Sequence, residues 1–301
     1  MNLNKADRYL KTDIINILDN GYKDHNPRPR YSDNVPAHTL SIAHSVKTYD
    51  LSKGEFPITS LRPIAWKSGI KEMFWIYQDA SNDLNLLRDK YNVHYWDAWE
   101  SKEMPSTIGK TYGYVVKKYD LMNKLLDGLK NDPYGRRHII DLFQYEELEN
   151  TDGLYPCAFL TIWNVRNDGN GKEYLDMSLI QRSGDLLPAA GAGAINECQY
   201  AALQMMVARH CGYEVGMFTH FVANLHLYDR HMEAASEIVR RHDFEQLTFI
   251  GKLMNKESVD DSQPQLILNP DKINFYDFTI DDFEMINYNP VKPQLKLDLG
   301  I

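Results

Sequence analysis

Stretches with helical and with strand periodicity follow one another irregularly along this chain of 301 residues, and this order constrains the fold most. The expected helices are 3–20, 68–79, 119–133, 196–213 and 230–241, and the expected strands are 38–50, 136–144, 157–167, 174–183 and 218–228. The two kinds of element do not alternate at the regular spacing of βαβ units. The pattern therefore predicts an α+β fold rather than a doubly wound parallel sheet.

Two local signals sharpen this assignment. The segment NDGNGK between the strands 157–167 and 174–183 is typical of a hairpin turn. Helix 196–213 has the strongest apolar pattern; Asn196 is a plausible N-cap and Gly212 a plausible end.

No internal repeat, low-complexity tract or linker divides the chain. The most loop-like stretches, 24–37, 101–109 and 252–271, do not shift composition enough to mark a boundary. A length of 301 residues is compatible with one or two domains. We therefore predict a single domain over residues 1–301.

The charge balance excludes one broad class of partner. The chain has 33 basic and 42 acidic residues, a net charge of −9, which argues against a general nucleic-acid-binding surface. A few arginines can still build a local phosphate site on an acidic protein. We expect a small anionic ligand rather than DNA.

Cysteine usage and hydropathy suggest the compartment. The three cysteines are widely spaced and odd in number, which fits a reducing environment. No apolar run is long enough to span a membrane, and the N-terminus lacks the apolar core of a secretory signal. We expect a cytoplasmic protein that does not bind membranes. The absence of a CxxC, an HExxH or a tight Cys/His cluster predicts no metal site.

Cys157 lies where a loop enters an expected strand, directly after a proline. A lone cysteine is commonly a small buried apolar residue. A nucleophilic cysteine needs a thiolate, which nearby cations favour, and Arg136, Arg137 and Arg182 could supply them. Both interpretations remain open from the residues alone, whereas Cys198 and Cys211 are expected to pack within a helix.

Other polar residues suit recognition of an anion or a sugar. In QRSGD, the arginine offers a donor fork and the serine a hydroxyl. His226 and Tyr228 lie on one face of a strand and could share a hydroxyl ligand. Glu72 lies within the apolar run KEMFWIY, where desolvation would raise its pKa; it could instead pair with Lys71 or lie on a polar stripe.

An ordered set of motifs resembles the thymidylate synthase family over nearly the whole chain. The motifs are PAHTLS (36–41), IKEMFWIYQDASND (70–83), HYWDAW (94–99), TIGKTYG (107–113), DPYGRRHII (132–140), PC (156–157), QRSGD (181–185), N-x-x-QY (196–200), GYEVG (212–216), HLYDRH (226–231) and FYDFTIDDFEMINY (275–288). Each is weak alone, but the ordered set is specific. The resemblance implies a single α+β domain with a mixed sheet packed with helices, and a homodimer through the sheet face.

The resemblance also implies roles on the nucleotide side. Cys157 resembles the nucleophile that adds to C6 of a pyrimidine nucleoside 5′-monophosphate. The other residues expected to bind the nucleotide, with Arg28 favoured over Arg30, are Arg28, Arg136, Arg137, Gln181, Arg182, Ser183, Asn196, His226 and Tyr228. Arg136 and Arg137 would reach the phosphate of the partner subunit, and Asn196 would read O4 and N3 of uracil. The thiol pKa would be lowered by four surrounding arginines.

Further roles concern the co-substrate, 5,10-methylenetetrahydrofolate. Glu72 resembles the carboxylate that organises water and proton transfer, and Tyr112 an aromatic residue that orders the reaction centre. The residues expected on the folate side are Trp96, Trp99, Asp185 and the terminal Ile301. The implied class is a methylenetetrahydrofolate-dependent C1 transferase without a metal.

Departures from the family pattern bear on which reaction the sequence predicts. After QRSGD the chain reads LLPAAGAGAIN, with about three extra residues before Asn196 and without the family's glycine, proline and phenylalanine. Ala223-Asn224 replaces a Gly-Asp pair, and Ala158 stands where many members carry histidine. If these changes loosen the folate pocket, water could capture the exocyclic methylene.

These departures narrowly favour a pyrimidine-nucleotide hydroxymethylase acting on dUMP, dCMP or CMP. The alternative is thymidylate synthase proper, which converts dUMP to dTMP and forms dihydrofolate. A remote alternative is an inactive nucleotide- or RNA-binding member. The intact HYWDAW and TIGKTYG motifs favour the synthase, and Asn196 favours uracil over cytosine.

Overall fold

A mixed sheet forms the centre of the protein, as the computed structural model of residues 3–241, 263–298 and 300 shows. Over this described part the strands run in the order β1-β2-β7-β5-β4-β3, and β6 pairs with β7. The strands are β1 (Tyr22–Lys23), β2 (Thr39–Asp50), β3 (Ile139–Asp141), β4 (Ala158–Asn167), β5 (Glu173–Gln181), β6 (Gly184–Asp185) and β7 (Glu214–Tyr228). Strand β7 pairs in parallel with β5 and β6, whereas the other pairs are antiparallel. A separate antiparallel pair joins β8 (Gln265–Leu268) and β9 (Phe283–Ile286).

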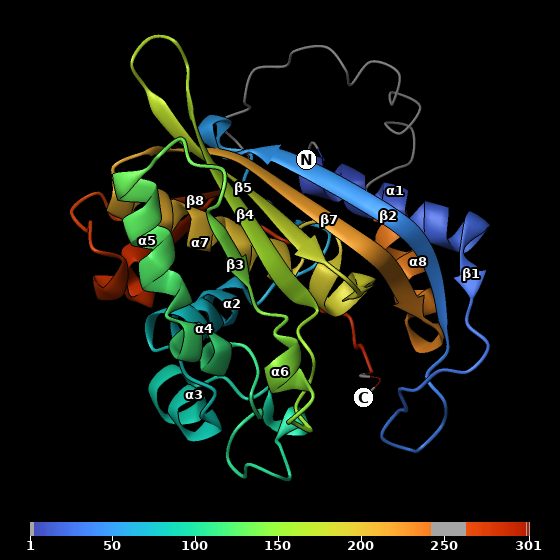
Figure 1. Ribbon diagram of the computed structural model, residues 1–301. Helices are drawn as coiled ribbons and strands as arrows, with labels where there is room; N and C mark the ends of the chain where they lie inside the picture. Colours follow the sequence, from blue (N-terminus) through green and yellow to red (C-terminus); the bar gives the residue numbers. More distant parts are fainter. Residues whose placement is uncertain (1–2, 242–262, 299, 301) are drawn as a thin grey trace.

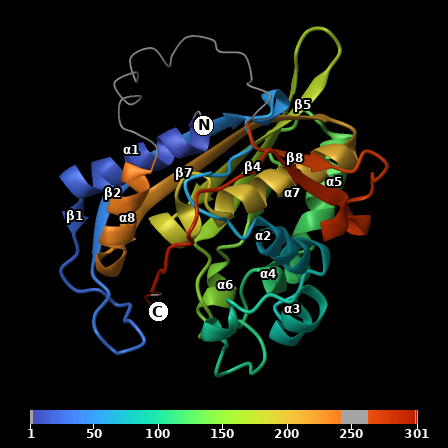
Figure 2. The ribbon, with the colours of Figure 1, turned by 180° about the vertical axis from the view of Figure 1, so that it is seen from behind.

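Helices cover one face of this sheet. They are α1 (Lys5–Asn20), α2 (Trp66–Met73), α3 (Leu84–Tyr91), α4 (Gly113–Tyr119), α5 (Leu121–Asn131), α6 (Tyr145–Leu148), α7 (Ile195–Cys211) and α8 (Met232–Arg240), with π-helical segments η2 (Phe74–Gln78) and η4 (Leu186–Ala190). Figure 1 looks onto the sheet from the side opposite α7, and Figure 2, from behind, shows α7 lying across the sheet. Helix α7 contacts both β5 and β7, and α1 packs on β2 beside α8.

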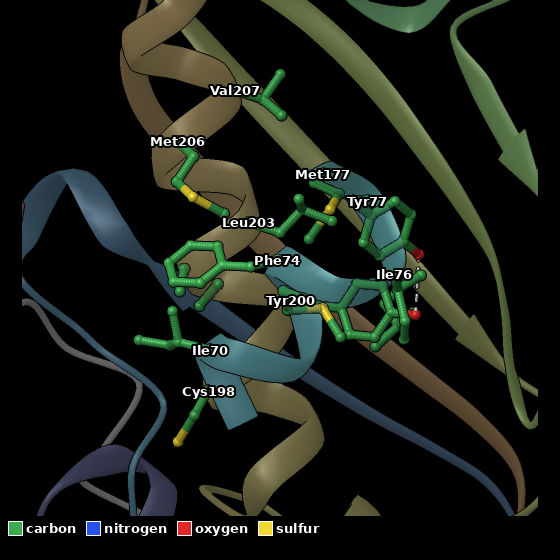
Figure 3. Packing of buried hydrophobic residues seen from close by; sticks show 14 of the residues in the cluster. Ile70, Phe74, Ile76, Tyr77, Met177, Cys198, Tyr200, Leu203, Met206 and Val207 are labelled. Atoms are coloured by element: carbon green, nitrogen blue, oxygen red, sulfur yellow. Dashed lines mark hydrogen bonds between the residues drawn. The ribbon is translucent and has the colours of Figure 1, made fainter. Parts of the chain in front are cut away.

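Helix α7 is the centre of the main hydrophobic core. It is buried on nearly all sides, which explains why its apolar residues are not confined to one stripe. Leu203 and Met206 lie toward Phe74 at the end of α2, whereas Val207 points to the other side of α7 (Figure 3). The two helices approach closely at Gly69, where an added Cβ would lie 2.8 Å from the Ile195 side chain. This close packing fixes the middle of α2 against the first turns of α7.

Truncation of Leu203 tests this core. Leu203 is fully buried, so Leu203→Ala removes apolar contacts and leaves a cavity. We expect the free energy of unfolding in urea to fall by about 2–5 kcal/mol. Leu18→Ala, at a position 37% exposed on α1, is the control and should cost much less. Equal losses in the two variants would contradict the assignment of α7 as the core helix.

Most expected elements are confirmed, with four corrections. Asn196 does not cap α7, because the helix already begins at Ile195 and Ala194 is the N-cap residue. The expected helix 68–79 changes to π-helix at Phe74. The loop-like stretch 252–271 contains β8, whose partner β9 lies far along the chain; its part 252–262 lies outside the described residues. The short helices α3 and α4 were not expected from the periodicity.

The expected hairpin joins β4 and β5. Its turn is closed by the Asp168 N–H donating to the Lys172 carbonyl at 3.1 Å, and Gly169 and Gly171 take positive φ. The face of the sheet away from α7 stays partly apolar: Val46 is 53% exposed, and Ile162, Ile180 and Phe221 are half-buried. Among the described residues, no helix is long and apolar enough to cross a membrane.

Candidate active site

Six residues singled out from the sequence line one small cavity. The cavity, of about 60 Å³, lies between α2, the start of α7, the end of β5 and the segment that enters β4. Its lining is Glu72, Met73, Ile76, Trp96, Tyr112, Cys157, Ala158, Gln181, Asn196, Gln199 and Tyr200. A larger hollow of about 300 Å³ beside Tyr77 and Tyr276 contains none of the expected site residues, and its lining holds no cysteine. The smaller cavity is therefore the candidate active site.

Cys157 is half-buried and lies directly before Ala158, the first residue of β4. Its backbone N–H donates to the Tyr112 hydroxyl at 3.3 Å. Tyr112 has a φ of +48°, a costly backbone conformation for a non-glycine residue. Burial raises the pKa of the Cys157 thiol, and the charges of Arg182 and Arg28 only partly oppose this rise. The expected lowering of the thiol pKa is thus wrong for a single chain.

Cys198 and Cys211 are packing residues, as expected. Both lie on α7 as free thiols. Cys198 is fully buried, and its thiol lies 3.2 Å from the Pro57 carbonyl oxygen. Burial raises the pKa of both thiols. Neither lines the cavity, so Cys157 is the cysteine available for chemistry there.

Arg182 holds the loop that carries Cys157. Its guanidinium donates to the carbonyl oxygens of Pro156 at 2.9 Å and Tyr155 at 2.8 Å. Its backbone N–H donates to the Cys157 carbonyl at 3.0 Å. The side chain is nevertheless exposed, and Ser183 beside it is half-buried. One cation therefore both positions the thiol loop and faces solvent beside it.

Within one chain, only two of the four expected arginines, Arg182 and Arg28, oppose the rise in the pKa of the Cys157 thiol. Arg28 is exposed, and its charge influences both Cys157 and Tyr228. Arg30 instead donates to the Asn34 carbonyl of its own loop at 2.8 Å, which favours Arg28 for the site. Arg136 and Arg137 are exposed before β3 and do not line the cavity. A single chain therefore does not surround Cys157 with four arginines.

Glu72 is buried at the end of α2. It accepts hydrogen bonds from the Tyr95 hydroxyl and from Gln199 Nε2, the latter at 2.7 Å. Burial raises its pKa, while these donors favour the charged form and limit the rise. A carboxyl group that is buried, hydrogen-bonded and open to a cavity suits proton transfer. The alternatives of a Lys71 pair or a solvent-exposed stripe are excluded by this burial.

Asn196 lies between two glutamines at the start of α7. Its Oδ1 accepts from Gln181 Nε2 at 3.3 Å, and its Nδ2 donates to Gln199 Oε1 at 2.9 Å. Gln199 is one helical turn after Asn196, so both side chains lie on the same helix face. Glu72, Gln199, Asn196 and Gln181 form one hydrogen-bonded row along the cavity wall.

His226 and Tyr228 lie at the end of β7, outside the cavity lining. Their rings meet edge to face, with centroids 5.3 Å apart, which confirms that they share one strand face. Burial lowers the pKa of His226 and raises that of Tyr228 to about 12. His226 Nδ1 is 3.1 Å from the side-chain oxygen of Asn224, which belongs to the Ala223-Asn224 pair that departs from the family pattern. A neutral imidazole beside a neutral phenol suits binding of a hydroxyl group.

Aromatic residues form a second wall. The Trp96 ring meets Tyr112 at 5.1 Å and Trp99 at 5.7 Å between centroids, both edge to face. Trp96 is buried, whereas Trp99 is half-buried. Trp96 and Tyr112 line the cavity, and Trp99 contacts Trp96 without lining it.

The C-terminal segment approaches the end of β7. The His231 Nε2 atom lies 2.8 Å from the Asp298 carbonyl oxygen, and Gly300 packs against the Tyr228 ring. Asp185 stands beside the same histidine, with its Oδ1 atom 3.7 Å from Nδ1. Asp185 is thus near the C-terminal segment rather than in the cavity. Ile301, expected at the folate side, lies outside the described residues.

Sequence reasoning missed several residues of the site. Gln199 and Tyr200 belong to the N-x-x-QY motif, and their helical spacing from Asn196 could have placed them on the cavity wall. Tyr95 bonds Glu72 from a turn between helices, and no local pattern announces that contact. Within the described ranges no group of three or more His, Cys, Asp or Glu residues could hold a metal ion.

Comparison with known proteins decides the family. The model of the family described as thymidylate synthase matches residues 7–301. The chain belongs to the thymidylate synthase family. A thymidylate synthase of Streptococcus sanguinis is 51% identical over 297 residues, covering 98% of this chain and 99% of the relative. One of Lactococcus lactis is 50% identical with the same coverage.

A solved structure supports the fold as well. The thermostable thymidylate synthase A from Bacillus subtilis superposes with a TM-score of 0.82 at 34% identity, covering 98% of this chain and 99% of that one. The expected single thymidylate-synthase-like α+β domain is therefore confirmed. The expected class, a methylenetetrahydrofolate-dependent C1 transferase, is confirmed by the thymidylate synthase relatives. The hydroxymethylase favoured above gains no support, since these relatives are named thymidylate synthases.

Proposed function

We propose that the protein is a thymidylate synthase, which converts dUMP and 5,10-methylenetetrahydrofolate to dTMP and dihydrofolate. The observation that carries this proposal is the row of Asn196, Gln199 and Glu72 along the same cavity as the Cys157 thiol. Relatives that are about half identical over nearly their whole length bear the same name. The exact reaction and the residue roles below are parts of this proposal.

On the nucleotide side, the Cys157 thiolate adds to C6 of uracil, and C5 then attacks the one-carbon unit of the folate. The amide of Asn196 complements the O4 acceptor and the N3–H donor of uracil. Arg28, Arg182 and Ser183 bind the 5′-phosphate, and His226 with Tyr228 binds the 3′-hydroxyl. Burial raises the pKa of Cys157, and the charges of Arg182 and Arg28 oppose this rise and so favour the thiolate that adds to C6.

On the folate side, Trp96, Trp99 and Tyr112 offer aromatic surface to the pterin. Glu72 holds water and moves protons at the base, because burial raises the pKa of its carboxyl group and so eases the gain and loss of a proton. Asp185 and the C-terminal segment around Ile301 are proposed to contact the reduced folate. Exclusion of water keeps the methylene for hydride transfer from the folate itself.

The unusual segment after QRSGD packs inward instead of opening the cavity. Leu186, Leu187, Ala190 and Ala192 are fully buried in a second core cluster with α1 and α8. At Gly193 φ is +66°, and an added Cβ would lie 2.2 Å from the Thr59 nitrogen. None of these residues lines the cavity. The burial of these four residues argues against an opening of the cavity by the insertion, and it supports the synthase over the hydroxymethylase.

Product analysis tests the proposal. The enzyme is incubated with methylenetetrahydrofolate and, separately, dUMP, dCMP, UMP or CMP, and the products are weighed. We expect a 5-methyl product from dUMP and a rise in absorbance near 340 nm from dihydrofolate. A 5-hydroxymethyl product without that rise would establish the hydroxymethylase instead. No product from any of the four nucleotides would favour the inactive member.

We also propose a homodimer through the open face of the sheet. Partly exposed apolar side chains on that face (Val46, Ile162, Ile180 and Phe221) would be covered by a second copy. The exposed Arg136 and Arg137 would then reach the partner's phosphate, since they do not line their own cavity. The cytoplasmic location expected above stays a prediction.

Subunit complementation tests the shared site. Chains carrying Arg136→Ala and Arg137→Ala together are mixed with Cys157→Ala chains after reversible dissociation. Each parent should be nearly inactive, whereas half of the reassembled dimers should contain one complete site. We expect about one quarter of wild-type activity, measured as dTMP formed. Activity no higher than that of the parents, with dimers present, would show that the arginines do not serve the partner.

A further inference from the structure

A buried pair of titratable groups lies behind the cavity. Glu197 and His220 are fully buried, and Glu197 Oε1 is 3.0 Å from His220 Nδ1. The Tyr49 hydroxyl and the Gly193 N–H each donate to Glu197 Oε2 at 2.7 Å. On its other side, His220 Nε2 is 3.0 Å from Gln181 Oε1. Neither Glu197 nor His220 lines the cavity, so neither touches the nucleotide in the proposed reaction.

Backbone carbonyls fix the direction of the hydrogen bonds. Gln181 Nε2 lies 3.0 Å from the Ser183 carbonyl oxygen, which can only accept, so this end of the amide is the NH₂ group. The oxygen of Gln181 must therefore face His220, and His220 Nε2 must carry a hydrogen. If Glu197 is ionised, His220 is an imidazolium. If Glu197 is protonated, His220 is a neutral imidazole. Both states place a hydrogen on Nε2.

The same direction continues to Asn196. Gln181 Nε2 also donates to Asn196 Oδ1, and Asn196 Nδ2 donates to Gln199 Oε1. At the far end, Gln199 Nε2 faces the Gly69 carbonyl at 3.3 Å and Glu72 at 2.7 Å. A reversed Asn196 amide would therefore place oxygen against oxygen at Gln199 and NH₂ against NH₂ at Gln181. The row permits one orientation of Asn196.

That orientation matters because uracil and cytosine present opposite patterns. Uracil offers an acceptor at O4 and a donor at N3, whereas cytosine offers a donor at the amino group and an acceptor at N3. One orientation of an asparagine amide complements the first base, and the reversed orientation complements the second.

We infer that His220 and Glu197 are positioning residues for base recognition: the Nε2–H of His220 fixes Gln181, and Gln181 holds Asn196 in the orientation that selects uracil. This inference rests on the proposed function for the identity of the base. Loss of the His220 donor leaves the buried Gln181 oxygen without a partner, so Gln181 is held only at its NH₂ end and its hold on Asn196 weakens. The pair thus acts on specificity without touching the substrate.

Four variants separate positioning from stability. His220→Phe keeps a ring and removes the donor. The double variant Glu197→Leu with His220→Phe replaces the pair by apolar groups, so neither group of the pair is left buried without the other. Glu197→Gln keeps an oxygen for Tyr49 and Gly193 and offers an NH₂ to His220 Nδ1, so Nε2–H remains. Tyr49→Phe, the matched control, removes one hydrogen bond to Glu197 and leaves His220 unchanged.

The measurement is the ratio of the Kd values for dCMP and dUMP, with thermal unfolding followed on each variant. We expect the ratio to fall by about tenfold or more in His220→Phe and in the double variant. In Glu197→Gln and Tyr49→Phe it should stay within about threefold of wild type, even if Tm falls. A double variant that folds and keeps the wild-type ratio would overturn the inference, and it carries the test if His220→Phe does not fold.

A second measurement is made on the wild-type protein, and variants serve only to assign its signals. The ¹⁵N shifts of His220 in the wild-type protein, assigned by their loss in His220→Phe or in the double variant, should show a hydrogen on Nε2. An unprotonated Nε2 would overturn the inference, whatever the enzyme's substrate. If the wild-type protein prefers dCMP, the proposed function fails, but a changed ratio still supports the positioning role.

Discussion

Cys157→Ala abolishes turnover, by about 10⁴-fold or more, while dUMP still binds. The expected loss is this large because without the thiol no covalent bond to C6 can activate C5. Binding should survive, since Arg28, Arg182 and Asn196 do not depend on the sulfur atom. The measurements are single-turnover rates with dUMP and methylenetetrahydrofolate and the Kd of dUMP by calorimetry.

Cys211→Ala is the matched control. Cys211 is a free, half-buried cysteine at the end of α7 and lies outside the cavity lining. It should retain wild-type turnover. Residual turnover of Cys157→Ala within tenfold of wild type would remove the nucleophile assignment. So would a covalent nucleotide adduct on Cys198 or Cys211 in the wild-type protein.

Local patterns predicted the elements whose own residues determine them. The strong apolar pattern of α7, the hairpin glycines after β4 and the strand character of β7 were read directly from the sequence. By contrast, β8 depends on pairing with β9, which follows it by about fifteen residues, and no local periodicity encodes a partner. The cap of α7 was misplaced because a good capping residue, Asn196, is used for the site instead.

The residues of the site could be predicted mainly from the motifs. They brought Glu72, Tyr112, Cys157 and Asn196 together correctly, because the order of motifs carries the fold with it. The pKa of Cys157 was expected to be lowered, yet it is raised by burial, since a count of nearby arginines says nothing of desolvation. Arg136 and Arg137 point to solvent in one chain, a fact that only three-dimensional placement reveals.

Glu72→Gln is expected to lower kcat by about 10²–10⁴-fold, the usual range for loss of a positioned acid or base. The amide of this variant keeps one acceptor for Tyr95 or Gln199 and stays close in volume to the carboxyl group, so dUMP binding should change little. The catalytic loss arises because an amide cannot gain or lose a proton in this pH range. We would measure kcat and KM between pH 5 and pH 9, and expect the pH dependence due to Glu72 to vanish. Glu284→Gln, at an exposed position on β9, is the control and should match wild type.

Whereas Glu72→Gln lowers kcat, it should stabilise the folded protein relative to wild type as the pH rises. Burial raises the folded-state pKa of Glu72 above its ordinary value of 4.5, so the folded protein favours the protonated form. Its stabilising contribution is complete below the ordinary pKa and is lost as the pH rises through the folded-state pKa. The Tm of Glu72→Gln relative to wild type should therefore increase from pH 4 to pH 8. A difference in Tm that is constant over this range would show that Glu72 keeps its charge on folding, and the proton-transfer role would then need another group.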